Sequence, residues 1–304
     1  METHLQKLKG VIVPVATPVD SAGDPDLAAL RRLLSFLLVH SLDGLFANGS
    51  MGGFAHLTDA SQYQIIETIT AYPRGVPVVA GVSDTSISRV RQKIAVIQTM
   101  PVAALVLLPP YYYMCRQDEL IRFFLLAADF AQKPIILYDN PRYTQNALEP
   151  ATIAGLARHP NIHGIKISAP DVLKWEQVLE HELPRDRFSL VCGAEKLMDV
   201  ALGMGFDGIT GGLHNITPGL AVQLYRAASS GDAATASRLQ AQLNRIYQVF
   251  EADGGWRGLE VAFAALSMPA RFAPPPHDIP VPEEKKRGIL EILESENVLA
   301  ANPA

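Results

Sequence analysis

The sequence has few of the features that mark secreted, membrane or nucleic-acid-binding proteins. Only two cysteines, Cys115 and Cys192, occur among its 304 residues, and they form no disulfide or metal-binding motif. No apolar run approaches the roughly 20 residues of a membrane-spanning helix, and the polar segment 1–10 lacks the apolar core of a signal peptide. The formal net charge is −5, and no basic stretch is long enough to suggest nucleic acid. We therefore expect a cytoplasmic protein with neither a membrane nor a nucleic-acid partner.

The sequence does contain a regular alternation of short apolar segments with longer segments of helical period. Hydrophobic residues make up 48% of the chain, which is enough for a large core. The expected strands are 11–16, 44–47, 76–80, 103–108, 134–138, 162–168, 188–192 and 208–210. The expected helices between and after them are 26–40, 58–71, 86–99, 118–131, 150–158, 171–180, 196–204 and 218–230.

Eight strand-then-helix units predict an α/β fold, the (β/α)₈ barrel, over residues 1–230. The alternative is a doubly wound open sheet, whose nucleotide-binding form would need a glycine-rich turn after the first strand. Thr17-Pro18-Val19-Asp20 stands there instead. The remaining residues, 231–304, predict a C-terminal helical region with helices at 233–250, 256–267 and 282–298.

Polar residues cluster where the expected strands end, and active sites of barrel enzymes lie at these carboxyl ends. The segments concerned are 48–53, 109–113, 138–141, 164–168 and 211–212. We expect them to meet at one rim of the barrel, which predicts an enzyme with its active site there.

Lys166 is the most informative of these side chains. Because side chains alternate along a strand, Gly164, Lys166 and Ser168 share one face, while Ile165 and Ile167 share the other. The isoleucines suit packing against helices, so the lysine face points into the barrel, where Gly164 would leave room beneath it. Loss of solvation there favours the neutral amine, a nucleophile that can form a Schiff base. The pattern alone also allows a lysine that reaches solvent or pairs with a carboxylate.

Two further features have a use in Schiff-base chemistry. Tyr138 ends the strand next to that of Lys166, so its hydroxyl could move the protons that imine formation and carbon–carbon cleavage require. The loop at 49–52 could offer backbone N–H groups to a carboxylate. From pattern alone, Tyr138 could also be a rim aromatic in the core. Tyrosines 111–113 favour a subunit interface, and the loop favours a generic turn.

Six short motifs, in order and at matching spacing, make the chain resemble the dihydrodipicolinate synthase/N-acetylneuraminate lyase family. The first-strand motif, the G-[ST]-x-G-E loop, P-Y-Y, Y-N-x-P, G-I-K and the last two strand ends of that family all have counterparts. They are Pro14-Val15-Ala16-Thr17-Pro18, Gly49-Ser50-Met51-Gly52, Pro110-Tyr111-Tyr112, Tyr138-Asp139-Asn140-Pro141, Gly164-Ile165-Lys166, and Cys192-Gly193 with Gly208-Ile209-Thr210, Asn215 and Pro218.

The resemblance implies a class I aldolase or lyase that makes or breaks a carbon–carbon bond. It implies that Lys166 forms a covalent imine with pyruvate or another 2-oxo acid, and that Tyr138 is the proton shuttle. Ser50 and Tyr112 would complete a hydroxyl relay, with Tyr112 reaching into the site of a neighbouring subunit. The substrate carboxylate would bind the backbone of Ser50 and Met51.

The resemblance further implies that Gly193 and Thr210 frame the substrate. The partners would be a small 2-oxo acid and an aldehyde, and the chain would form a homo-oligomer, either a dimer or a homotetramer. No metal and no cofactor beyond the imine would be needed, in agreement with a sequence that has no His-x-His or comparable ligand cluster.

Departures from the family pattern bear on the substrate. The loop glutamate is replaced by Gly53, and the second hydroxyl residue by Met51. A dihydrodipicolinate synthase would carry an arginine two residues after the proline of Y-N-x-P. Here Tyr143 occupies that position, and Arg142 falls one place early.

Ser168 lies two residues after the lysine, where sugar-acid aldolases carry a hydroxyl. Our first hypothesis is therefore cleavage or formation of a 2-oxo-3-deoxy sugar acid or a related hydroxy-oxo acid. The second is 4-hydroxy-tetrahydrodipicolinate synthase, which condenses pyruvate with aspartate semialdehyde and would require Arg142 to replace the missing arginine. The third is a catalytically silent sensor that binds 2-oxo acids, for which the changed loop is the best support.

Overall fold

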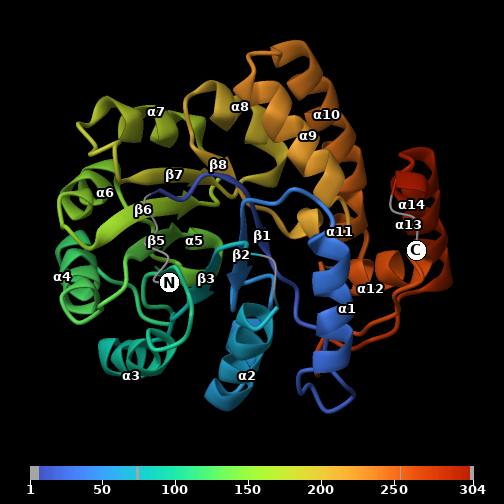
Figure 1. Ribbon diagram of the computed structural model, residues 1–304, viewed down its shortest axis with the longest axis horizontal. Coiled ribbons are helices and arrows are strands. Elements are labelled where there is room, and N and C mark those ends of the chain that lie inside the picture. The colour runs from blue at the N-terminus through green and yellow to red at the C-terminus, as the bar shows by residue number, and fades with distance from the viewer. Residues whose placement is uncertain (1–6, 73–74, 254, 302–304) are drawn as a thin grey trace. The chain divides into compact units, whose positions relative to one another are not determined.

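The strands form a closed parallel barrel in sequence order, which confirms the predicted (β/α)₈ fold (Figure 1). The computed structural model describes residues 7–72, 75–253 and 255–301. The strands are β1 (Gly10–Pro14), β2 (Gly44–Ala47), β3 (Val78–Gly81), β4 (Ala104–Leu107), β5 (Ile135–Asp139), β6 (Ile162–Ile167), β7 (Ser189–Cys192) and β8 (Gly208–Ile209). Nearly every strand residue is buried, as expected when a parallel sheet has helices on its outer face.

Helices follow the strands at the predicted places. Asp26 caps α1 by accepting from the amides of Ala28 and Ala29, and Thr58 caps α2 by accepting from that of Ser61. The helices are α1 (Leu27–Leu37), α2 (Asp59–Thr70), α3 (Ile87–Ile97), α4 (Gln117–Ala128), α5 (Pro141–Thr144), α6 (Pro150–Ala157), α7 (Val172–Glu180), α8 (Met198–Gly203) and α9 (Pro218–Ser229). Later in the sequence come α10 (Ala233–Ile246), α11 (Gln248–Asp253), α12 (Trp256–Ala265), α13 (Glu283–Ser295) and α14 (Val298–Ala301).

Contacts group the described residues into two compact units. The first comprises the chain up to Ile12 together with Asp43–Phe46 and Gly75–Thr210, and it holds almost the whole sheet. The second comprises Val13–Leu42, the described residues from 47 to 72, and those from Gly211 onwards. The predicted division at 230/231 stays a prediction.

The register of β5, β6 and β7 in the first unit aligns the residues at their carboxyl ends. Tyr138 on β5 is the direct partner of Lys166 on β6, which in turn is opposite Val191 on β7. The pairing of β5 with β6 skips His163, so that Ile135 is opposite Ile162 but Ile136 is opposite Gly164. Three backbone hydrogen bonds extend the pairing past the strand ends: Ser168 to Asp139 (2.9 Å), Gly193 to Ile167 (2.7 Å) and Thr210 to Cys192 (2.8 Å).

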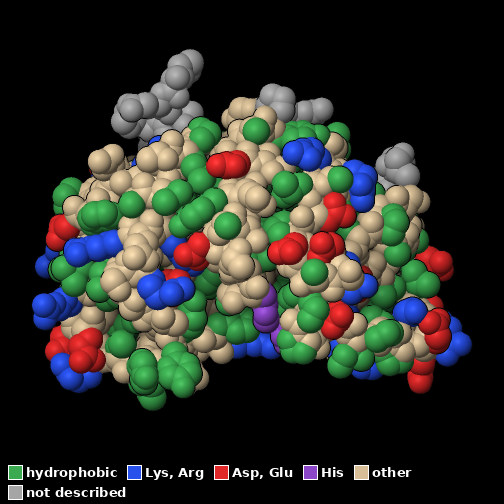
Figure 2. Space-filling view, turned by 90° about the horizontal axis from the view of Figure 1, so that it is seen from below, with side chains coloured by type: hydrophobic (Ala, Val, Ile, Leu, Met, Phe, Trp, Pro, Cys, Tyr) green, Lys and Arg blue, Asp and Glu red, His purple; other side chains and the backbone are tan. Residues whose placement is uncertain are grey.

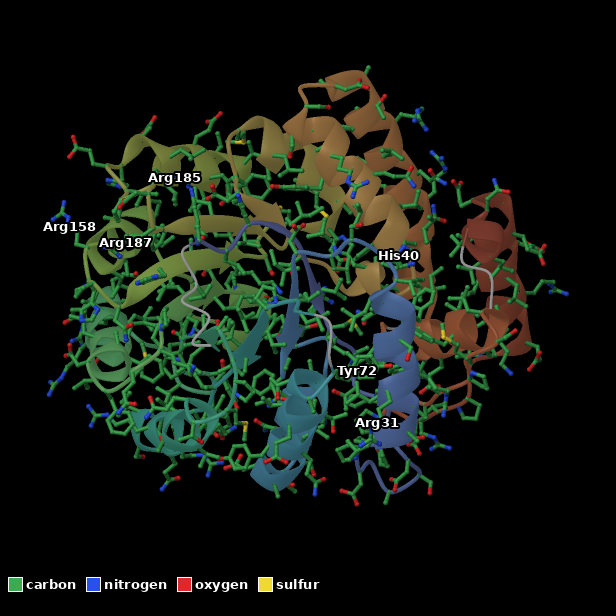
Figure 3. All side chains as sticks on the ribbon, viewed as in Figure 1. Arg31, His40, Tyr72, Arg158, Arg185 and Arg187 are labelled. Atoms are coloured by element: carbon green, nitrogen blue, oxygen red, sulfur yellow. The ribbon has the colours of Figure 1, made fainter. Side chains whose placement is uncertain are left out.

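Two arginines hold the amino-terminal ends of β6, β7 and β8, and Figure 3 labels both. Arg187, just before β7, donates to the carbonyls of Ile162 (2.8 Å) and Ala157 (2.9 Å). Arg185 donates to the carbonyl of Gly205 (2.8 Å) and pairs with Asp207 (3.0 Å). These two side chains therefore serve stability, as is usual at this end of the fold.

The second unit is built mainly from helices. The hydroxyl of Ser35 on α1 contacts that of Tyr72, which follows α2 and is labelled in Figure 3. Helices α9 and α10 pack side by side (Figure 1). Asn215 joins this unit's segments from both ends of the chain, because it bonds the carbonyl of Pro14 (2.9 Å) and the amide of Ala16 (3.0 Å).

The surface carries charges of both signs. On the face seen in Figure 2, Lys and Arg side chains alternate with Asp and Glu side chains, with hydrophobic ones between them. Among the helices of the described ranges, none combines the length and the apolar character needed to cross a bilayer.

Candidate active site

Lys166 and Tyr138 form the centre of the candidate site, in the first unit. Lys166 is 8% exposed and Tyr138 is 3% exposed. The lysine Nζ lies 4.3 Å from the centroid of the Tyr138 ring and 5.2 Å from that of Phe46. In the described part of the chain Lys166 pairs with no carboxylate. The two structural alternatives for Lys166, a lysine that reaches solvent and a lysine in an ion pair with a carboxylate, are therefore excluded.

The face of β6 that carries Lys166 is the inward one, as the alternation predicts. Ile165 and Ile167 are fully buried on the other face. The reason for Gly164 differs from the expected one: a Cβ at that position would lie 2.8 Å from the carbonyl oxygen of Ser189 on β7. The glycine is thus required by the close approach of the neighbouring strand, and the space beneath the lysine is a secondary matter.

Gly193 is in direct contact with the lysine. A Cβ added to it would lie 2.8 Å from the Lys166 Cε and would collide with the hydroxyl of Ser168. Ser168 is half-buried. The structure therefore brings together three of the residues that the sequence predicts, Lys166, Ser168 and Gly193, at the carboxyl ends of β6 and β7.

Asn140 and Phe46 belong to this site, although the sequence reasoning did not single them out. The Asn140 side-chain amide donates to the Tyr138 hydroxyl oxygen at 3.0 Å, and Asn140 is only 7% exposed. The Phe46 ring packs edge-to-face on Tyr138, with centroids 6.2 Å apart. Phe46 could have been found from the alternation on its strand, whereas Asn140 occupies the variable position of the Y-N-x-P motif and gave no signal.

Thr210 and Cys192 lie at the ends of β8 and β7. Thr210 is 2% exposed, and its hydroxyl has no hydrogen-bond partner among the described residues. A buried hydroxyl without a partner is costly, which is typical of a position that a ligand completes. Burial raises the pKa of the Cys192 thiol to about 12. This cysteine therefore stays protonated and is no nucleophile.

The glycine-rich loop lies in the second unit. Asn48 has a left-handed backbone (φ 55°), and its side-chain amide donates to the carbonyl of Gln62 at 3.2 Å. The Ser50 hydroxyl is buried without a hydrogen-bond partner in the described ranges. The backbone N–H groups of Ser50 and Met51 likewise meet no acceptor there. These three donors are available to an anionic ligand.

Trp256 holds this loop from the C-terminal part of the second unit. Its indole N–H donates to the carbonyl of Met51 at 2.9 Å. Gly53, where the family loop has a glutamate, adopts φ 66°, and a Cβ there would lie 3.5 Å from the indole ring. The rings of His56 and His277 lie 5.3 Å and 5.8 Å from that of Trp256. Burial, and to a lesser extent the nearby His277, lowers the pKa of His56.

Tyr112 is not buried with Lys166 and Tyr138. It is 80% exposed, adopts φ 90°, and stacks edge-to-face on Tyr113 at 4.9 Å. The side-chain amide of Asn146 holds the loop by donating to the carbonyls of Pro110 (2.7 Å) and Tyr113 (2.9 Å). Within one chain, therefore, this tyrosine faces solvent.

Arg142 is also exposed, and its guanidinium lies 5.8 Å from the ring of Tyr143, which is 61% exposed. Within the described ranges, no group of three or more His, Cys, Asp or Glu could hold a metal ion.

The chain is similar to known proteins over most of its length. The model of the dihydrodipicolinate synthetase family matches residues 7–296. The 4-hydroxy-tetrahydrodipicolinate synthase of Exiguobacterium sibiricum is 28% identical over 288 residues, which are 94% of this chain and 96% of that protein. The probable 2-dehydro-3-deoxy-D-pentonate aldolase YjhH of Escherichia coli is 27% identical over 299 residues, covering 97% and 99%. The crystal structure of Escherichia coli YagE with pyruvate superposes with a TM-score of 0.89 at 27% identity, covering 96% and 99%.

Proposed function

The chain belongs to the dihydrodipicolinate synthetase family and is a pyruvate-dependent lyase or aldolase; on that premise we propose that Lys166 carries its chemistry as an imine. The amine attacks the carbonyl carbon of a 2-oxo acid, and water leaves as the imine forms. The imine then accepts the electron pair of the carbon–carbon bond that breaks, or supplies the enamine that attacks an aldehyde. The main support for this proposal is the buried Lys166 amine, whose Nζ lies 4.3 Å from the centroid of the Tyr138 ring.

We propose Tyr138 as the group that moves protons at the imine. Its position opposite Lys166 on the neighbouring strand suits transfer to and from the carbinolamine and the aldol hydroxyl. The resemblance assigns Ser50 and Tyr112 to the same relay. The unpartnered hydroxyl of Ser50 supports this role, and the exposure of Tyr112 supports its contribution to a second copy in a homodimer or homotetramer.

We propose that the substrate carboxylate binds the backbone N–H groups of Ser50 and Met51. Both lack an acceptor in the described structure, and consecutive backbone N–H groups form good anion sites. With the imine as electron acceptor, this chemistry calls for no metal and no other cofactor. The two cysteines are free, which supports a cytoplasmic location.

A 2-oxo-3-deoxy sugar acid or related hydroxy-oxo acid is the proposed substrate. Ser168 places a hydroxyl beside Gly193 and Lys166, where a polyhydroxylated chain could bond it. Thr210 and Gly193 would frame the same substrate. Condensation of pyruvate with aspartate semialdehyde is the second candidate, but the exposed Arg142 stacks on Tyr143 rather than entering a buried site.

Borohydride reduction in the presence of pyruvate tests the imine directly. We expect one reduced pyruvyl adduct, found by mass spectrometry on the tryptic peptide that contains Lys166, and we expect Lys166→Ala to lose both adduct and activity. Lys93, a second buried lysine that pairs with Asp84 at 3.1 Å, serves as the internal control and should stay unlabelled. An adduct at another lysine, or none in folded protein, would overturn both enzyme proposals, and binding of pyruvate without an adduct would favour the silent sensor.

A further inference from the structure

We infer that Asn140 is a positioning residue. It controls the pH at which the Tyr138 hydroxyl ionises and the direction in which the hydroxyl hydrogen points. The inference rests on the proposed function for its consequence in catalysis, but the hydrogen bond on which it depends is a property of the protein without substrate. The Asn140 side-chain nitrogen lies 3.0 Å from the Tyr138 oxygen, and both residues are buried.

The position of Asn140 makes this contact a departure from its usual role. Asn140 precedes α5, and asparagine at such a position ordinarily caps the helix with its side-chain oxygen. Here the side chain makes no cap hydrogen bond. The backbone carbonyl of Asn140 instead accepts from the amides of Tyr143 (3.1 Å) and Thr144 (3.2 Å). The side-chain amide is thereby left to bond the tyrosine.

A side-chain amide has a specific effect on a phenol. Its N–H stabilises the phenolate more than the phenol, because a hydrogen bond to the charged form favours that form. Asparagine itself neither gains nor loses a proton at ordinary pH, so it cannot compete with Tyr138 as the shuttle. With Asn140 donating to the oxygen, the phenol's own hydrogen must point elsewhere, and Lys166 lies on the ring's face at 4.3 Å.

The turn after β5 does not depend on the Asn140 side chain for its structure. The turn after β5 is already held by the backbone carbonyl of Asn140 and by the buried Asp139, which pairs with Lys174 at 2.5 Å and accepts from the Leu148 amide at 3.0 Å. Removal of the Asn140 amide should therefore leave the fold in place and change the tyrosine.

The test compares Asn140→Leu, which keeps the approximate volume without a donor, with Asn140→Asp, which places a carboxylate at the same oxygen. Ionisation of Tyr138 is followed by NMR of ring-labelled tyrosine in protein without substrate, with Tyr138→Phe to assign its signal. We expect the titration midpoint to rise by about one pH unit in Asn140→Leu and further in Asn140→Asp. Under the proposed function, the basic limb of the kcat profile should rise with it, while KM for pyruvate changes little.

Asn161→Leu is the matched control, because Asn161 also donates from a turn, where it is half-buried, to the carbonyls of Ala128 (3.0 Å) and Ala131 (2.8 Å). It should reduce stability and leave the tyrosine titration unchanged. An unchanged Tyr138 titration in folded Asn140→Leu and Asn140→Asp would overturn the inference. If the titration moves but no adduct forms on Lys166, the proposed function fails and the hydrogen-bond role stands.

Discussion

The two regions that the proposed reaction requires differ in how far they keep the family pattern. Lys166 and Tyr138, on β6 and β5 of the first unit, match the motif side chains. The loop of the second unit has Met51 and Gly53 where the family has a hydroxyl residue and a glutamate. The difference follows from chemistry. An imine and a proton shuttle need one particular side chain each, whereas a carboxylate bound by backbone N–H groups tolerates changes in the side chains around it.

The two regions are also held in different ways. Buried ion pairs support the first unit: Asp139 with Lys174 at 2.5 Å, and Asp84 with Lys93 at 3.1 Å. In the second unit, the Trp256 indole both donates to the loop and fills the space next to Gly53. The comparison therefore predicts that changes in the first region reduce kcat, while changes around the loop raise KM.

Tyr138→Phe should have the largest effect and is the strongest way to break this comparison. Loss of a positioned proton-transfer group lowers kcat by about 10²–10⁴-fold, and KM for pyruvate should change little because the loop is untouched. Steady-state kinetics give both values. Tyr72→Phe, which removes a hydroxyl that contacts Ser35, is the matched control and should retain full activity. A mutant with normal kcat and raised KM would reverse the assignment.

Ser168→Ala should cost about 1–3 kcal/mol in kcat/KM on 2-oxo-3-deoxy sugar acids, because a polar substrate group is left unpaired. The loss should be absent for pyruvate imine formation alone. Ser189→Ala is the control. Ser189 lies on the neighbouring strand β7, and its hydroxyl accepts from the Leu8 amide at 2.8 Å. It should lower stability without changing selectivity. Equal losses for sugar acids and for aspartate semialdehyde would remove Ser168 from the specificity argument.

The two regions should lose stability in different ranges of acid pH. Burial would raise the pKa of Asp84, but the Arg89 hydrogen bond, the Thr85 amide and Lys93 outweigh it and hold the pKa at about 2. This lies below the value of about 3.9 in the unfolded chain, so the stabilisation is present above about pH 4 and is lost as pH falls to about 2. We expect the free energy of unfolding to fall by roughly 2 kcal/mol in that window, measured by urea denaturation.

One variant and one histidine sharpen the acid prediction. Asp84→Asn should lack the step between about pH 4 and pH 2, and a step of the same size in that variant would assign it to another carboxylate. The pKa of His56 beside the loop is lowered by burial and by His277. Its contribution is therefore present above the unfolded value of about 6.5 and is lost as pH falls below it, so the loop should respond closer to neutrality than the ion pairs do.

Trp256→Phe should have the smallest effect. It keeps the aromatic contacts but removes the hydrogen bond to Met51, worth about 1 kcal/mol. We expect a several-fold higher KM for pyruvate at nearly unchanged kcat. Trp175→Phe removes a similar bond, from the indole to the carbonyl of Ala169 at 3.2 Å, and should leave KM unchanged. If both variants changed KM equally, the loop would have no special part in binding.

Periodicity was sufficient to predict the barrel, because each strand is a short apolar run and a helix follows each one. Short or distant features gave no such signal. Helix α5 has only four residues, fewer than any periodic pattern needs. Trp256 meets Met51 across 205 residues of sequence. The role of Asn140 depends on where its side chain turns after the strand, which local propensity would assign to a helix cap.

The bulge at His163 has a consequence for following how this protein folds. Because β6 skips one residue against β5, Lys166 comes opposite Tyr138 in one pairing only, and a slip of a single residue would turn the lysine to the opposite face of the sheet. A refolding chain can regain its helices and compactness while β6 is paired with β5 in the wrong register. Such a chain would be unable to trap pyruvate. The time course of the borohydride-trappable pyruvate adduct, compared with that of circular dichroism, would therefore report when β5 and β6 reach their correct register.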